Sequence, residues 1–209
     1  MLCWMAGALT PDEESRIDSV LGGARNPINW LVRGIWLFKS AQVLLDAKEA
    51  VDKRLWRSSL FQMSRWRRPS DEEIREHSLA FEESMGLGMA SVLLRGLAIE
   101  NLLKGILVQH DAERWVPRPG AAHKPLYHWT HDLETLARNA EVMLDQEDGR
   151  VCRQLTLFIE WGGRYPTAMA PKKHGPEGAS WKGDDNRRVD TLYKRLREQL
   201  QNAIGIKGL

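Results

Sequence analysis

The sequence predicts an all-α protein: an up-and-down bundle of four to five long helices with extra terminal helices. Apolar residues recur at helical spacing over long segments, and Ser, Thr, Asp and Pro stand where helices would begin. No segment alternates polar and apolar residues long enough to predict a strand, and no repeat of roughly 20–50 residues is visible. With 209 residues, 43% of them hydrophobic, the chain can bury one large core, which excludes a disordered protein.

The first expected helix begins at Thr10-Pro11, an N-cap followed by a proline at the first helical position, and it ends at Gly22-Gly23. Asn26-Pro27 begins a second helix, whose apolar periodicity continues to about Leu60 as one long helix or two helices with a kink. We therefore assign residues 1–25 to an N-terminal extension.

Ser70 and Glu73 predict a capping box and a helix to about Glu83. A longer helix over 84–110 is either separate from it or continuous with it. Three prolines and a glycine predict a loop over 111–128.

Thr130 is the expected cap of a helix that runs to about Leu144, and Asp148-Gly149 is the expected start of another that ends at Gly162-Gly163. After a loop over 164–183, Asp184 opens a final polar helix to about Ala203. We assign 26–170 to the bundle and 171–209 to a basic loop and C-terminal helix.

Charge and cysteine content exclude several classes of protein. The net charge of +2 gives no global field for a polyanion, and two distant cysteines exclude a disulfide scaffold or a cysteine zinc site. The longest uncharged run, 1–11, is too short to span a bilayer and lacks a cationic start, so we expect a cytoplasmic protein without a membrane segment. Motifs for nucleotide phosphates, dinucleotides, zinc proteases and serine hydrolases are absent, and no cofactor or metal is expected.

The most informative segment is Val92–Val108, which is apolar nearly all round and is therefore expected to be surrounded by other helices. Glu100 lies within an apolar stripe of this helix, and Lys104 lies one turn further on. Buried charges need partners. Either Glu100 pairs with Lys104 or with an arginine from another helix, or these groups line a polar cleft.

Four segments in this order resemble the HEPN superfamily of helical domains. They are Trp36-Leu37-Phe38-Lys39-Ser40-Ala41, then Ala98-Ile99-Glu100-Asn101-Leu102-Leu103-Lys104, then His131-Asp132-Leu133, and finally Trp161-Gly162-Gly163-Arg164-Tyr165-Pro166. The resemblance covers about residues 28–170. It implies a helical bundle, often a homodimer, that acts as a metal-independent ribonuclease or toxin of phage defence and toxin–antitoxin systems, or as a non-catalytic partner of a nucleotidyltransferase.

Catalytic members of that family carry an Arg followed by a His four to six residues later, and they cleave RNA by general acid–base chemistry. Arg164 stands after the last core helix without such a histidine, and the literal Arg-x4-His of this chain is Arg118 to His123. The candidate catalytic residues are therefore Arg164, Glu100, Lys104, Arg118 and His123, and enzymatic activity stays open. Arg164 could equally fold back to pair with Glu100.

Two segments combine features of nucleic-acid binding. Residues 54–68 hold five arginines and three aromatics without an acid, and residues 164–209 carry a local charge of +5. The expected contacts are Arg65, Trp66, Arg67, Arg68, Lys172 and Lys173. The alternative for 54–68 is a solvated helix face with its tryptophans packed inward.

The nine tryptophans divide along the predicted helices. Trp30, Trp36 and Trp161 are expected to pack the bundle or a dimer face, whereas Trp56, Trp66 and Trp181 are candidates for nucleic-acid contact. His131, by contrast, is interpreted as part of a helix start rather than as a metal ligand.

Two functions follow as hypotheses. The first is a dimeric HEPN-like protein that binds RNA or a nucleotide and can act as a ribonuclease in a defence or toxin–antitoxin setting. The second is a non-catalytic helical interaction module whose protein partner is encoded nearby.

Overall fold

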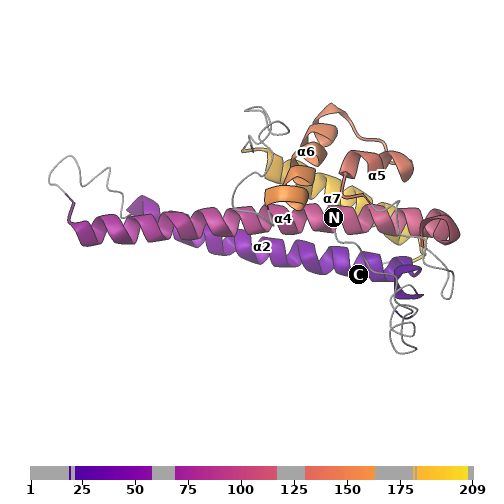
Figure 1. The fold of residues 1–209 in the computed structure, drawn as a ribbon, viewed down its shortest axis with the longest axis horizontal. Helices are drawn as coiled ribbons and strands as arrows, with labels where there is room; N and C mark the ends of the chain where they lie inside the picture. Colours follow the sequence, from indigo (N-terminus) through magenta and orange to yellow (C-terminus); the bar gives the residue numbers. More distant parts are fainter. Residues whose placement is uncertain are drawn as a thin grey trace, which may run out of the picture.

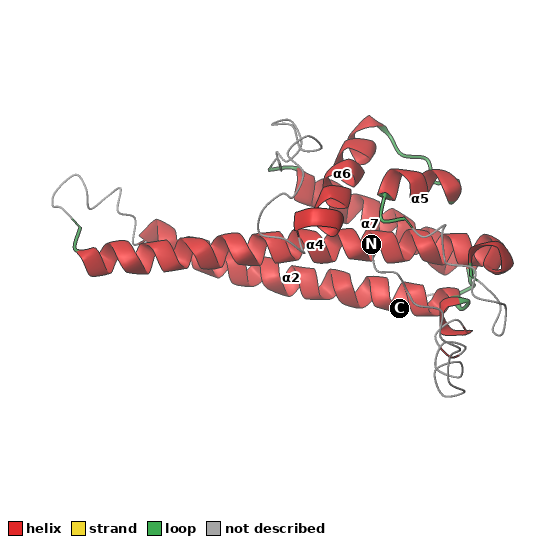
Figure 2. Cartoon of the chain, viewed as in Figure 1, coloured by secondary structure: helices red, strands yellow, loops and turns green. Residues whose placement is uncertain are grey.

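The computed structural model describes residues 19, 22–57, 69–116, 130–162, 181 and 183–206. Their helices are α2 (Pro27–Arg57), α4 (Asp71–Trp115), α5 (Leu133–Asn139), α6 (Gln146–Leu157), the π-helical turn η1 (Phe158–Gly162) and α7 (Asp185–Ala203). These described ranges contain helices and no strand, which confirms the all-α prediction (Figure 2). None of the described helices is both long enough and apolar enough to cross a membrane.

The long helix α4 is continuous over the two segments, 70–83 and 84–110, that the sequence predicted as either separate or joined helices. Its start is the predicted capping box: Glu73 N donates to Ser70 Oγ (3.3 Å) and Ser70 N donates to Glu73 Oε2 (2.8 Å). Asp111 interrupts the helix with φ −156° and ψ 87°, and its carboxylate then accepts from Arg114 N (3.0 Å). The predicted loop from residue 111 is therefore wrong for its first residues, because the carboxylate of Asp111 caps one more helical turn ending at Trp115.

Helices α2 and α4 lie antiparallel as a long hairpin (Figure 1). Small residues let the two backbones approach: a Cβ placed on Gly34 would lie 3.1 Å from the Leu102 side chain. Ser91 Oγ donates to the carbonyl of Ala41 (3.1 Å) across the same interface. The second helix expected from Asn26-Pro27 is thus one long helix over its described residues.

One half of this hairpin is covered by the other helices. A Cβ on Gly96 would lie 3.1 Å from Ile159, and one on Gly105 would lie 2.6 Å from Leu200, so η1 and α7 pack directly on the backbone of α4. Helix α7 is polar, as predicted, except for one buried stripe formed by Val189, Leu192, Tyr193, Leu196 and Leu200. We call this covered half the bundle.

The other half of the hairpin projects beyond the bundle (Figure 1). We call it the arm and define it as residues 43–57 of α2 and 71–90 of α4. Its inner contacts are partly polar, since Ser84 Oγ donates to Asp52 Oδ1 (2.5 Å) and Lys48 also pairs with Asp52.

Several helix ends differ from the sequence prediction. Asp132, not Thr130, caps α5, and its carboxylate accepts from Glu134 N (3.0 Å) and Thr135 N (3.2 Å). Helix α5 ends at Asn139 instead of about Leu144.

Helix α6 begins at Gln146 under an Asp145 cap, so the predicted start at Asp148-Gly149 is wrong. Asp145 and Asp148 compete as caps here, and local sequence does not rank them. Gly149 instead allows a close approach of α5, because a Cβ there would lie 2.8 Å from Glu134 Oε1.

The expected ends at glycine pairs have different outcomes. Helical backbone continues through Gly22 and Gly23 to Ala24, past the predicted end, while most of the helix expected before them lies outside the described residues. The π-helical turn reaches Gly162, where the sequence predicted an end. Asp184 opens α7 as predicted, and α7 ends at Ala203.

Candidate functional site

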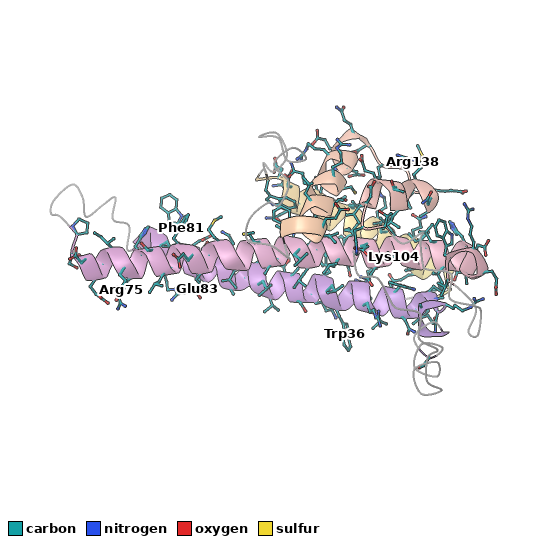
Figure 3. The ribbon with its side chains drawn as sticks, viewed as in Figure 1. Trp36, Arg75, Phe81, Glu83, Lys104 and Arg138 are labelled. Atoms are coloured by element: carbon teal, nitrogen blue, oxygen red, sulfur yellow. The ribbon has the colours of Figure 1, made fainter. Side chains whose placement is uncertain are left out.

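The central charged pair of α4 is closed inside the bundle. Lys104 Nζ donates to Glu100 Oε1 across one helical turn, and the two residues are only 7% and 4% exposed. Lys104 Nζ also lies 6.0 Å from the ring centroid of Trp30 (Lys104 is labelled in Figure 3). The i, i+4 pairing considered from the sequence is therefore confirmed, and so is the burial of both groups.

His131 approaches the same carboxylate from the turn before α5. Its Nδ1 lies 3.0 Å from Glu100 Oε2, and its side chain is half-buried. An ionised carboxylate only accepts hydrogen bonds, so Nδ1 carries the proton and Nε2 of a neutral ring is the acceptor. Sequence reasoning interpreted His131 as part of a local helix start, and this was incomplete because its partner lies 31 residues away.

Both carboxylate oxygens of Glu100 are thus in use, one by Lys104 and one by His131. Pairing and hydrogen bonding on both oxygens is what a buried carboxylate requires. The arrangement ties the turn before α5 to the centre of α4, and it leaves His131 as the member of the cluster with the most exposed side chain.

A second buried cation, Arg95, was not singled out from the sequence. Its guanidinium donates to the carbonyl and the side-chain oxygen of Asn186 (both 3.2 Å) and forms an ion pair with Asp190 (3.2 Å). It also lies 5.4 Å from the ring centroid of Phe38, which stacks on Tyr193. Burial lowers the pKa of Arg95 and Asp190 partly opposes this, so the residue joins α2, α4 and α7 at an electrostatic cost.

An ionic network holds α7 against the start of α6. Buried Asp148 accepts from Arg188 Nε and from Arg195 Nη2, both at 2.7 Å. Arg188 also pairs with Asp145, and the hydrogen bonds from Asp148 N and Arg188 lower the pKa of that carboxyl. Of the basic residues in 164–209, Arg188 and Arg195 are therefore paired with carboxylates of this chain.

Most of the predicted site residues lie outside the described residues. For the catalytic set these are Arg164, Arg118 and His123. For the nucleic-acid set they are Arg65, Trp66, Arg67, Arg68, Lys172 and Lys173. Their roles stay predictions, and of the predicted catalytic set the structure describes Glu100 and Lys104.

The tryptophan predictions have mixed outcomes. Trp30 packs against the core as expected. Trp36 is exposed on α2 (Figure 3), so it does not pack into the described bundle, and the predicted dimer face stays a prediction. Trp181 packs against the core beside Phe158 and donates to Asn186 Oδ1 (3.3 Å), which removes it as a free stacking surface. Trp56 is exposed, so the alternative of inward packing is wrong for this residue.

In comparisons with protein-family models, curated proteins and solved structures, no match to this chain is found. The HEPN resemblance accordingly stays an expectation that rests on the four sequence segments.

Proposed function

We propose that this chain is a non-catalytic helical interaction module of the HEPN type that binds a protein partner through its arm. The observation that carries the proposal is the apolar surface that the arm exposes. Trp56 on α2 and Phe81 on α4 are both exposed there, beyond the helices that cover the bundle. Large aromatic side chains are the usual anchors of protein interfaces.

The closed Glu100–Lys104 pair supports the same proposal. A catalytic pair must reach its substrate, whereas both members of this pair are buried and satisfy each other. The pair then acts as part of the scaffold that holds the hairpin rigid. The expected setting is a complex with a nucleotidyltransferase or with other subunits of a defence system.

The test is co-purification of the tagged full chain from its native cells. We expect one stoichiometric protein partner, which a Phe81→Gln variant loses and a Trp36→Gln variant retains. Recovery of the wild-type chain without any partner, or a partner retained equally by both variants, would contradict the proposal.

The contact between His131 and Glu100 favours a second candidate, the metal-independent ribonuclease. In that role Glu100 fixes the His131 ring, and His131 Nε2 accepts the proton of an RNA 2′-hydroxyl as it attacks the adjacent phosphate. The 5′-oxygen leaves with a proton from a second group. The sequence offers Arg164 and His123 for that role, and both lie outside the described residues.

Labelled RNA incubated with wild type, His131→Ala, His123→Ala and Arg164→Ala tests this candidate. Cleavage that His131→Ala abolishes would establish it, and intact RNA with wild type under metal-free and divalent conditions would eliminate it. RNA binding through the predicted basic segments should weaken steeply with salt.

A further inference from the structure

Four apolar residues form a stripe along the arm portion of α4. Ile74, Phe81, Met85 and Met89 follow one another at spacings of seven, four and four residues, which places them on one helix face. Each is between 43% and 56% exposed. We call these four residues the α4 stripe.

The α4 stripe continues a face that is covered elsewhere. One turn beyond Met89 the same face carries Val92, which is buried, and then Gly96, which packs against Ile159 and Leu155. Phe81 points toward the side of α4 on which α6 lies (Figure 3). The described helices that cover this face in the bundle therefore end before the arm, and the part of the chain that the structure describes supplies no cover for the apolar face beyond them.

The charge of the arm selects what can cover the stripe. The arm holds nine Asp/Glu and five Lys/Arg, a net charge of −4 in a chain whose total is +2. Four of these five cations face carboxylates of the arm: Lys48 pairs with Asp52, Lys53 with Glu49, Arg54 with Glu83, and Arg75 with Glu72. Carboxylates are thus in excess among the described residues of the arm. Glu82, which follows Phe81 directly, lies on the flank of the stripe, whereas Glu83 pairs with Arg54 on α2.

We propose that the α4 stripe binds a basic amphipathic helix of a partner protein. This inference rests on the proposed function and names the chemical class of the partner. An amphipathic helix supplies apolar side chains at the spacing of the stripe, and Lys or Arg on its flanks meets the carboxylates of the arm. Met85 and Met89 adapt to differently shaped side chains, as methionines do at helix-binding surfaces.

The same charge argues against the other occupants. A second copy of this chain would bring the arm residues, of charge −4, against the same residues of its partner, and an RNA backbone or an anionic membrane would be repelled by them. The RNA-binding candidates Arg65, Arg67 and Arg68 belong to the segment 58–68, which is not part of the arm as defined above. A basic helix is the occupant for which both the apolar and the electrostatic contributions are favourable.

The test uses a labelled synthetic helix of about 18 residues made of Leu and Lys, with a Leu/Glu helix of the same pattern as its counterpart. Binding to the full chain is followed by fluorescence anisotropy. We expect a Kd on the order of 10 µM for the Leu/Lys helix, and at least about tenfold weaker binding of the Leu/Glu helix. Affinity should also fall with added salt.

Two matched variants locate the binding. Met85→Gln should weaken binding of the Leu/Lys helix at least about tenfold. Trp36→Gln, which changes an exposed aromatic on α2, should leave the affinity unchanged. Because both positions are exposed, both variants should keep the circular dichroism of wild type.

The inference is overturned if the Leu/Lys helix does not bind, if both peptides bind equally, or if the two variants behave alike. It is also overturned if sedimentation shows a wild-type dimer that Met85→Gln converts to a monomer, since a second copy would then cover the stripe. If a stoichiometric native partner co-purifies but the Leu/Lys helix does not bind, only the proposal that the partner presents a basic helix is refuted. If no partner co-purifies, the proposed function is refuted.

Discussion

The bundle and the arm each contain a Glu–Lys pair at i, i+4, and the two pairs differ in nearly everything but spacing. The side chains of Glu100 and Lys104 are 5% and 8% exposed, whereas those of Glu49 and Lys53 are 66% and 65% exposed. The first pair compensates charge that the fold has buried, and the second lies on a solvated helix face. The same local motif is therefore structural in one half of the hairpin and nearly neutral in the other.

This difference extends to the apolar residues of α4. Over 92–108 the helix is enclosed by α2, η1 and α7, while over 74–89 one apolar stripe faces outward. Because the packing contacts that stabilise the fold are concentrated in the bundle half of the hairpin, the arm half can remain available to a partner.

The largest expected effect comes from breaking the buried pair. Glu100→Leu should lower the free energy of unfolding by about 3–5 kcal/mol, because it leaves the Lys104 ammonium buried without this carboxylate. Glu49→Leu, the matched change on the arm, should alter it by less than about 0.5 kcal/mol. Urea unfolding of both variants measures the two values, and equal losses would contradict the contrast between the pairs.

A core truncation should have the next largest effect. Leu102→Ala removes a fully buried side chain that packs on Gly34 and should cost about 3 kcal/mol. Ile74→Ala on the α4 stripe should cost less than about 1 kcal/mol, since Ile74 is already 44% exposed. Thermal unfolding measures the loss of stability in the two variants. Equal losses would contradict the exposure of Ile74, because they would require its side chain to be buried.

The smallest effect is the pH dependence of the arm. Hydrogen bonds from Lys48 and from Ser84 hold the pKa of Asp52 below its ordinary value of 3.8. A carboxyl with a lowered folded-state pKa stabilises the fold above its unfolded-state pKa, and this contribution is lost as the pH falls through the folded-state pKa. Wild type should therefore be more stable than Asp52→Asn at pH 6, and the difference should shrink as the pH falls through the folded-state pKa of Asp52. A difference that grew on acidification would have the wrong sign.

The sequence predicts those parts of the fold that depend on neighbours along the chain. The Ser70–Glu73 capping box, the start of α7 and the Glu100–Lys104 pair each involve residues within four positions of one another, and each is confirmed. Helical periodicity also identifies which faces are apolar, but not which of them another helix covers. Trp36 was predicted to pack in the bundle or at a dimer face, and the structure excludes the first of these alternatives because the residue is exposed.

The parts that sequence reasoning missed depend on residues far apart in the chain. Arg95 contacts Asn186 and Asp190 on α7, and His131 contacts Glu100, so no local pattern identifies either contact. An arginine inside an otherwise apolar helix was the one available signal for Arg95, since a buried cation requires partners.

Hydrogen exchange of the full chain, with and without the Leu/Lys helix, tests the central claim most directly. In the free protein we expect amides of residues 71–90 to exchange faster than those of 95–108, because the arm opens without unfolding the bundle. Adding the peptide should slow exchange in 71–90 and leave 95–108 and 130–139 unchanged. Slowing centred on the segments that carry Glu100 and His131, with no change in the arm, would contradict the account.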